Sequence, residues 1–119
     1  MLLGELFPKI SSLSYLFRES EGVTVAHCLD LDLVATGSDR DTAERRLDTL
    51  VRAQIKMIAT KFNFADLNFA SPSEYWDQFY DGQEFKKARL ELEIPPIVVD
   101  VEQKVAVPVF MRATTAIAA

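Results

Sequence analysis

Cysteine and histidine are almost missing from this 119-residue sequence, which contains Cys28 and His27 and no others. An internal disulfide needs two cysteines, and a tetrahedral zinc site would have almost no ligands to draw on. No stretch approaches the ~18 uninterrupted apolar residues of a membrane span, and Glu5 stands where a secretory leader would be basic and then apolar. We therefore expect one cytoplasmic domain, residues 1–119, without a metal, a cofactor or contact with a membrane.

Positive charge is missing from one stretch. From Phe62 to Phe85 there are five acidic residues and no Lys or Arg, while acids and bases balance elsewhere, so this stretch accounts for the whole net charge of −5. Eight of the twelve aromatic residues lie in the same stretch. An acidic chain is poorly suited to non-specific binding of nucleic acid, which depends on Lys and Arg, and direct contact with nucleic acid is not expected.

This acidic, aromatic stretch is the strongest candidate for a binding surface. Interface hot spots favour Trp and Tyr, and an acidic rim steers a basic partner. Alternatively, its phenylalanines complete the core and its acids are merely solvated. We predict that a protein partner contacts Tyr75, Trp76, Asp77 and Asp81, together with Asp30 and Asp32 earlier in the chain.

The order of hydrophobic residues predicts an α+β fold. Apolar residues alternate with polar ones in Leu13–Arg18 and Val23–Cys28, and a further short apolar run, Leu33–Thr36, ends at Gly37. Three short antiparallel strands account for this pattern, and on the second strand His27 and Cys28 point to opposite faces.

A helix of about 20 residues should follow, capped by Ser38 or Asp39. Its apolar stripe packs on one face of the sheet and comprises Ala43, Leu47, Leu50, Val51, Ile55, Ile58 and Phe62, broken only by Gln54.

After the long helix, the pattern predicts a short helix and then more strands. Ser71-Pro72-Ser73-Glu74 begins the short helix, and Asp81-Gly82 ends it. Strand patterns return in Arg89–Ile94, Ile97–Val101 and Val105–Met111. Pro108 cannot donate to a ladder, which predicts an edge or partly unpaired position for the last strand. These C-terminal strands are more than a three-stranded sheet with one main helix can cover. Because unpaired strand edges tend to be covered by another chain, we expect a homo-oligomer.

The segments Val25–Asp32 and Ala35–Asp39, with Ala43 and Leu47 four residues apart, resemble the core of the HicB-like antitoxin family. The resemblance covers Ser12 to Lys61. It implies a truncated RNase H-like β-β-β-α core, assembly into oligomers, and a role as the neutralising partner of a small, basic ribonuclease toxin. Many such antitoxins bind operator DNA through a C-terminal helical motif. Here the C-terminal third of the chain has strand patterns and balanced charge, so binding to operator DNA is not expected.

Two catalytic alternatives are weighed against this non-catalytic reading. The carboxylates of Asp30, Asp32, Asp39 and Asp41 would suit a small metal-dependent nuclease only if they converged on Mg²⁺. Their simpler roles lie in a solvated loop and at a helix N-terminus. His27 next to Cys28 suggests a dyad, which the opposite orientation of neighbouring strand residues disfavours. A homo-oligomeric scaffold without a toxin partner is the third alternative.

Overall fold

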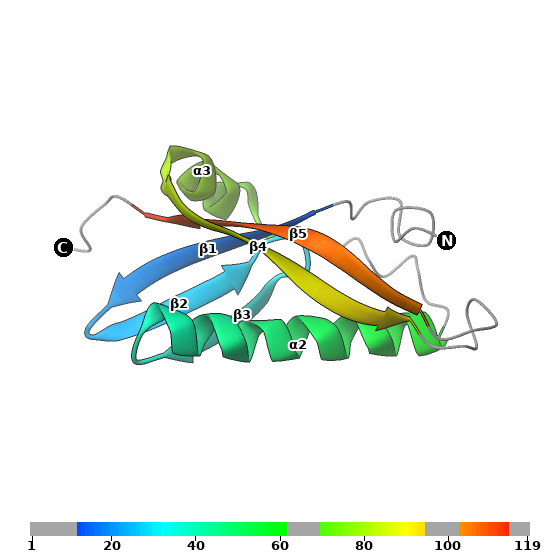
Figure 1. Ribbon diagram of the computed structural model, residues 1–119. Coiled ribbons are helices and arrows are strands. Elements are labelled where there is room, and N and C mark those ends of the chain that lie inside the picture. Colours follow the sequence, from blue (N-terminus) through cyan, green and yellow to red (C-terminus); the bar gives the residue numbers. More distant parts are fainter. Residues whose placement is uncertain (1–11, 62–69, 95–102, 115–119) are drawn as a thin grey trace.

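The computed structural model describes residues 12–61, 70–94 and 103–114, which form one five-stranded sheet with a helix on each face (Figure 1). The strand order is β3-β2-β1-β5-β4. The elements are β1 (Leu13–Ser20), β2 (Val23–Cys28), β3 (Leu33–Gly37), α2 (Arg40–Lys61), α3 (Ser73–Asp81), β4 (Gln83–Ile94) and β5 (Gln103–Ala113).

The first three strands form the predicted antiparallel meander. β1 and β2 pair from Tyr15↔Cys28 to Ser20↔Val23. The turn between them places Gly22 at φ +80 and Glu21 at φ 53, so glycine occupies one of two left-handed positions that a two-residue hairpin turn requires. β3 then pairs with β2 and lies at the edge of the sheet.

α2 also begins as predicted. The Thr42 amide donates to Asp39 Oδ1 over 2.7 Å, which makes Asp39 the capping residue. This hydrogen bond holds the pKa of the Asp39 carboxyl below its usual range. Ala43, Leu47, Val51 and Ile55 are buried against the sheet at four-residue intervals. Leu50 was wrongly assigned to this stripe, because it lies on the flank of the buried line and is 42% exposed.

The prediction of a three-stranded sheet is wrong, because both C-terminal strands join the same sheet. β5 lies between β1 and β4, parallel to β1 from Leu13↔Val109 onward, and β4 pairs antiparallel with β5. The last strand is therefore internal, and β4 forms the edge. Pro108 lies just outside the β1–β5 pairing, so it is partly unpaired as expected. The predicted strand at Ile97–Val101 falls outside the described residues.

α2 and α3 lie on opposite faces of the sheet (Figure 1), and each face has its own core. Under α2, Tyr15, Phe17 and Met111 belong to the larger cluster, which is continuous across all five strands. On the opposite face, Leu16, Leu29 and Phe79 form a smaller cluster beneath α3. No helix among the described residues is long and apolar enough to cross a membrane.

Candidate functional site

Three polar side chains meet where the β2–β3 loop reaches the start of α3. His27 Nε2 lies 2.8 Å from Asp32 Oδ1 and 3.0 Å from Ser71 Oγ, and the Ser71 hydroxyl donates to Asp32 Oδ1 over 2.8 Å. The His27 and Ser71 residues are only 3% and 5% exposed. Asp32 takes a left-handed φ of 52, which is uncommon outside glycine. This His27–Asp32–Ser71 cluster links β2, the β2–β3 loop and the residues before α3.

Arg18 and Tyr75 complete the surroundings of His27. Arg18 Nη2 lies 3.5 Å from His27 Nδ1, and its guanidinium lies over the Tyr75 ring at 4.9 Å from the centroid. The His27 and Tyr75 rings meet edge-on at 4.9 Å. Because a guanidinium can only donate, Nδ1 acts as the acceptor. Nε2 then carries the hydrogen and donates to Asp32, whose pKa is held below its usual range first by this bond and then by the bond from Ser71.

The cluster contains the residue types of a hydrolytic triad without its geometry. In such a triad one ring nitrogen takes the serine proton while the carboxylate holds the other. Here Ser71 and Asp32 both contact Nε2, and Nδ1 faces Arg18. The Ser71 amide also donates to the Leu29 carbonyl over 2.8 Å, so Ser71 is held at two atoms. The arrangement anchors the start of α3 on the β2–β3 loop.

Cys28 is in the core on the α2 face, away from His27, as the strand pattern predicted. Burial raises the pKa of its thiol, which leaves it a poor nucleophile. The two residues therefore form no dyad.

The four aspartates have separate surroundings. Asp30 accepts the Ser14 amide over 2.6 Å, and burial raises its pKa to about 6. Asp32 belongs to the polar cluster, Asp39 caps α2, and Asp41 is exposed in the first turn of α2. Within residues 12–61, 70–94 and 103–114, no group of three or more His, Cys, Asp or Glu side chains is placed to hold a metal ion.

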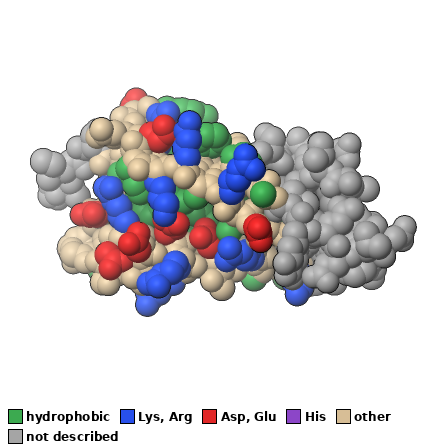
Figure 2. All heavy atoms as spheres, viewed as in Figure 1, with side chains coloured by type: hydrophobic (Ala, Val, Ile, Leu, Met, Phe, Trp, Pro, Cys, Tyr) green, Lys and Arg blue, Asp and Glu red, His purple; other side chains and the backbone are tan. Residues whose placement is uncertain are grey.

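The four partner-binding residues predicted on the short helix lie on α3. Asp77 and Asp81 are exposed, and both Tyr75 and Trp76 are half-buried against the smaller core. Tyr80, which the prediction omitted, is 66% exposed and stacks on Trp76 with ring centroids 6.2 Å apart and planes at 29°. Figure 2 shows hydrophobic side chains at the surface over α3, with charged side chains beside them. Phe79 is buried, as the core alternative required of it.

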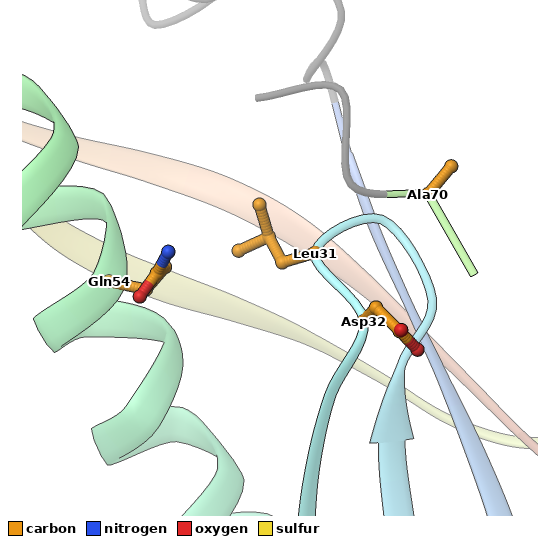
Figure 3. A pocket seen from close by; sticks show the side chains of 4 residues that line it. All are labelled: Leu31, Asp32, Gln54 and Ala70. Carbon is orange, nitrogen blue, oxygen red and sulfur yellow. The ribbon is translucent and has the colours of Figure 1, made fainter. Parts of the chain in front are cut away.

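A shallow depression of about 430 Å³ lies between α2 and the β2–β3 loop (Figure 3). The described residues that line it are Leu31, Asp32, Gln54 and Ala70. Leu31 stands between Gln54 and Asp32, and the Asp32 carboxylate is turned away from Gln54 (Figure 3). Gln54 of the apolar stripe thus borders open space, and among the described lining residues the polar groups of Gln54 and Asp32 do not converge.

Ser71 and Tyr80 were the residues that sequence reasoning missed. Ser71 lies 44 positions from His27, so no local pattern connects them. A signal existed for Tyr80, because it follows Trp76 by four positions and Asp77 by three, which places it beside both on α3.

Comparisons with protein-family models, with curated proteins and with solved structures found no match to this chain.

Proposed function

We propose that this chain is a non-catalytic binding module that recognises a basic protein through the outer surface of α3. We call this the α3 surface, made by Glu74, Trp76, Asp77, Tyr80 and Asp81. The observation that carries the proposal is the exposed Tyr80 ring, stacked on Trp76 and flanked by carboxylates. A rigid aromatic pair beside like charges is typical of interface anchors rather than of a merely solvated helix.

The charges near α3 support a basic partner. Glu74, Asp77 and Asp81 are exposed, and α3 has no basic residue in its last turn. The nearest arginines are used internally: Arg112 donates to the Tyr80 carbonyl over 3.3 Å and lies over the Phe79 ring, and Arg18 lies over Tyr75. These contacts leave the arginine charges in place, but α3 itself has three acidic residues and no Lys or Arg, so the helix presents net negative charge to an approaching protein.

A HicB-type antitoxin is the specific form of the proposal. Its support is the resemblance over Ser12–Lys61 and the matching order of β1, β2, β3 and α2. The partner would then be a small, basic ribonuclease toxin, and a homo-oligomer remains part of the expectation. The C-terminal strands supply less support for an oligomer than the sequence indicates, because β5 lies between β1 and β4 of the same sheet.

The binding test uses a partner captured by affinity purification from the source cell. Replacing Tyr80 with alanine should weaken binding roughly tenfold, because an exposed aromatic anchor is lost. The free energy of unfolding should change by less than about 0.5 kcal/mol, since the side chain is largely exposed. Isothermal calorimetry and thermal unfolding measure the two effects. Unchanged affinity for Tyr80→Ala would remove the central observation.

The acids of the α3 surface should act on the association rate. Reversing Asp77 and Asp81 to lysine is expected to slow association several-fold at low salt, with a smaller effect as ionic strength rises. The matched control is reversal of Glu19 and Glu21, which are exposed in and beside the β1–β2 turn. Stopped-flow or biosensor kinetics distinguishes the two pairs. Equal slowing by both pairs would mean that overall charge, rather than the α3 surface, steers the partner.

The alternative function, a metal-dependent nuclease, predicts RNA cleavage, whereas a binding module should have no nuclease activity. The purified protein should not cleave RNA in the presence of Mg²⁺, because Asp30, Asp32 and Asp39 are each engaged in a different local contact. The assay is cleavage of labelled RNA. Activity that co-purifies with the chain and disappears in an Asp30→Asn, Asp32→Asn double variant would favour the nuclease instead.

A further inference from the structure

The two edges of the sheet, β3 and β4, are each contacted by an arginine of α2. Arg46 Nη1 donates to the Thr36 carbonyl of β3 over 2.8 Å, and Arg52 Nε donates to the Glu91 carbonyl of β4 over 3.2 Å. The two arginines are six positions apart, roughly 240° around the helix. They therefore lie on opposite flanks of the buried line that runs from Ala43 to Ile55, one toward each edge of the sheet.

The Thr36 carbonyl points toward the open side of β3. The Leu29 amide donates to the Ser14 carbonyl over 2.9 Å, so the backbone N–H and C=O of Leu29 point toward β1. Because these groups alternate in direction along a strand, those of His27 and Val25 also point toward β1. The intervening residues Ala26 and Cys28 face β3 and pair there with Ala35 and Leu33. Val34 and Thr36 then direct their backbone groups outward, where no further strand lies among residues 12–61, 70–94 and 103–114.

The Glu91 carbonyl is directed outward by the same reasoning. Among the described strands β4 has β5 as its one neighbour, and Arg89 pairs with Pro108, which has no N–H. The Arg89–Pro108 pair cannot exchange two hydrogen bonds, so it is a non-hydrogen-bonded pair. The register continues without a shift from Arg89 to Glu91, so the Glu91–Ala106 pair is also non-hydrogen-bonded and the Glu91 backbone groups point away from β5. Arg52 thus binds a carbonyl that the ladder leaves free.

The β3 edge fits another copy of itself. Val34 and Thr36 lie symmetrically about Ala35. If β3 of a second copy paired antiparallel with this edge, Val34 of each copy would lie opposite Thr36 of the other, and each outward N–H would meet an outward C=O. Val34 and Val23 are 48% and 42% exposed on the same sheet face, which adds apolar area beside this edge. Unprotected edges of this kind recruit further strands.

We propose that Arg46 and Arg52 close the two sheet edges against strand addition by a second copy of this chain. Each guanidinium occupies an outward carbonyl and places a positive charge on the edge, which a joining strand would have to displace. Any homo-oligomer of the wild-type chain then uses a surface other than these edges. The proposal is independent of the proposed function, because none of the residues of the α3 surface takes part.

Sedimentation velocity of Arg46→Ala and Arg52→Ala tests the proposal. We expect each variant to self-associate with a dissociation constant at least roughly tenfold below that of the wild type, because freed carbonyls gain intermolecular partners. Arg45→Ala is the matched control, since the Arg45 guanidinium contacts Thr42 of its own helix. Adding Val34→Lys to Arg46→Ala should restore the wild-type state by placing a charge at the edge.

Two results would overturn the proposal: Arg46→Ala and Arg52→Ala associating no more than Arg45→Ala, or Val34→Lys alone dissociating a wild-type oligomer. Circular dichroism establishes that each variant is folded. Hydrogen exchange of the wild-type protein gives an answer even if a variant does not fold. The Val34 and Thr36 amides should exchange faster than the Ala35 amide at all protein concentrations. Protection that appears as concentration rises would mean that a strand adds at this edge despite Arg46.

Discussion

Replacing His27 with alanine is expected to lower the free energy of unfolding by about 3 kcal/mol. The buried ring loses its contact with Tyr75, and its hydrogen bonds to Asp32 and Ser71 disappear together. Ser71 stands two residues before α3, so release of this anchor should also raise amide exchange in α3 more than in α2. Chemical denaturation and hydrogen exchange measure the two effects.

Two variants separate the contributions of the His27 ring. His27→Phe keeps the ring against Tyr75 and removes the polar bonds, so we expect it to lose less stability than His27→Ala. Val34→Ala changes the directly paired but exposed position on β3 and should cost under about 0.5 kcal/mol. A His27→Ala protein within 1 kcal/mol of the wild type would contradict the anchoring role, because ~1 kcal/mol is the ordinary effect of a point mutation.

The first half of the fold could be predicted from the sequence because its signals are local. The alternation of Leu13, Tyr15 and Phe17 gave a strand, and Asp39 with the four-residue spacing from Ala43 to Ile55 gave a capped helix. Leu50 was misassigned because periodicity does not show how wide a stripe the sheet covers. That width depends on the twist and spacing of the strands below.

The placement of β5 could not be predicted in the same way. Its register against β1 joins Leu13 to Val109, a pairing between residues at opposite ends of the chain. The alternation of Val105, Val107 and Val109 identifies a strand but contains no information about its neighbours. The neighbours of β5 depend on packing across the whole sheet, because residues of β4, β5 and α2 belong to one core cluster with those of β1 to β3.

The candidate sites show the same division. Asp77 and Asp81 were identified from the acids and aromatics concentrated in one stretch of the chain, which is a local signal, and they are exposed as a binding surface requires. Asp30 and Asp32 are close in sequence and looked equivalent. The structure gives them opposite surroundings, since Asp30 is largely buried and Asp32 is hydrogen-bonded at the surface. Burial of a single carboxylate depends on residues far away in the sequence and leaves no pattern of its own.

Replacing Asp30 with asparagine is expected to stabilise the protein at pH 8 by about 2 kcal/mol. The pKa of the Asp30 carboxyl is raised to about 6, first of all by burial, so its charged form is disfavoured in the folded protein. The asparagine oxygen can still accept the Ser14 amide that Asp30 Oδ2 binds at 2.6 Å. Thermal or urea unfolding of the two proteins from pH 4 to pH 8 measures the difference.

The sign of the pH dependence follows from proton linkage. Between the ordinary pKa of an aspartate, near 4, and the folded value of about 6, the folded protein binds more protons than the unfolded chain. The wild-type protein therefore loses stability relative to Asp30→Asn as the pH rises through this window, and the two proteins converge below about pH 4. Asp32→Asn provides a control of opposite sign. The pKa of Asp32 is lowered by His27 and Ser71, so its charged form stabilises the fold above pH 4 and the variant should be the weaker protein at pH 8. A difference between wild type and Asp30→Asn that stays constant from pH 4 to pH 8 would contradict the assignment to titration and point to packing instead.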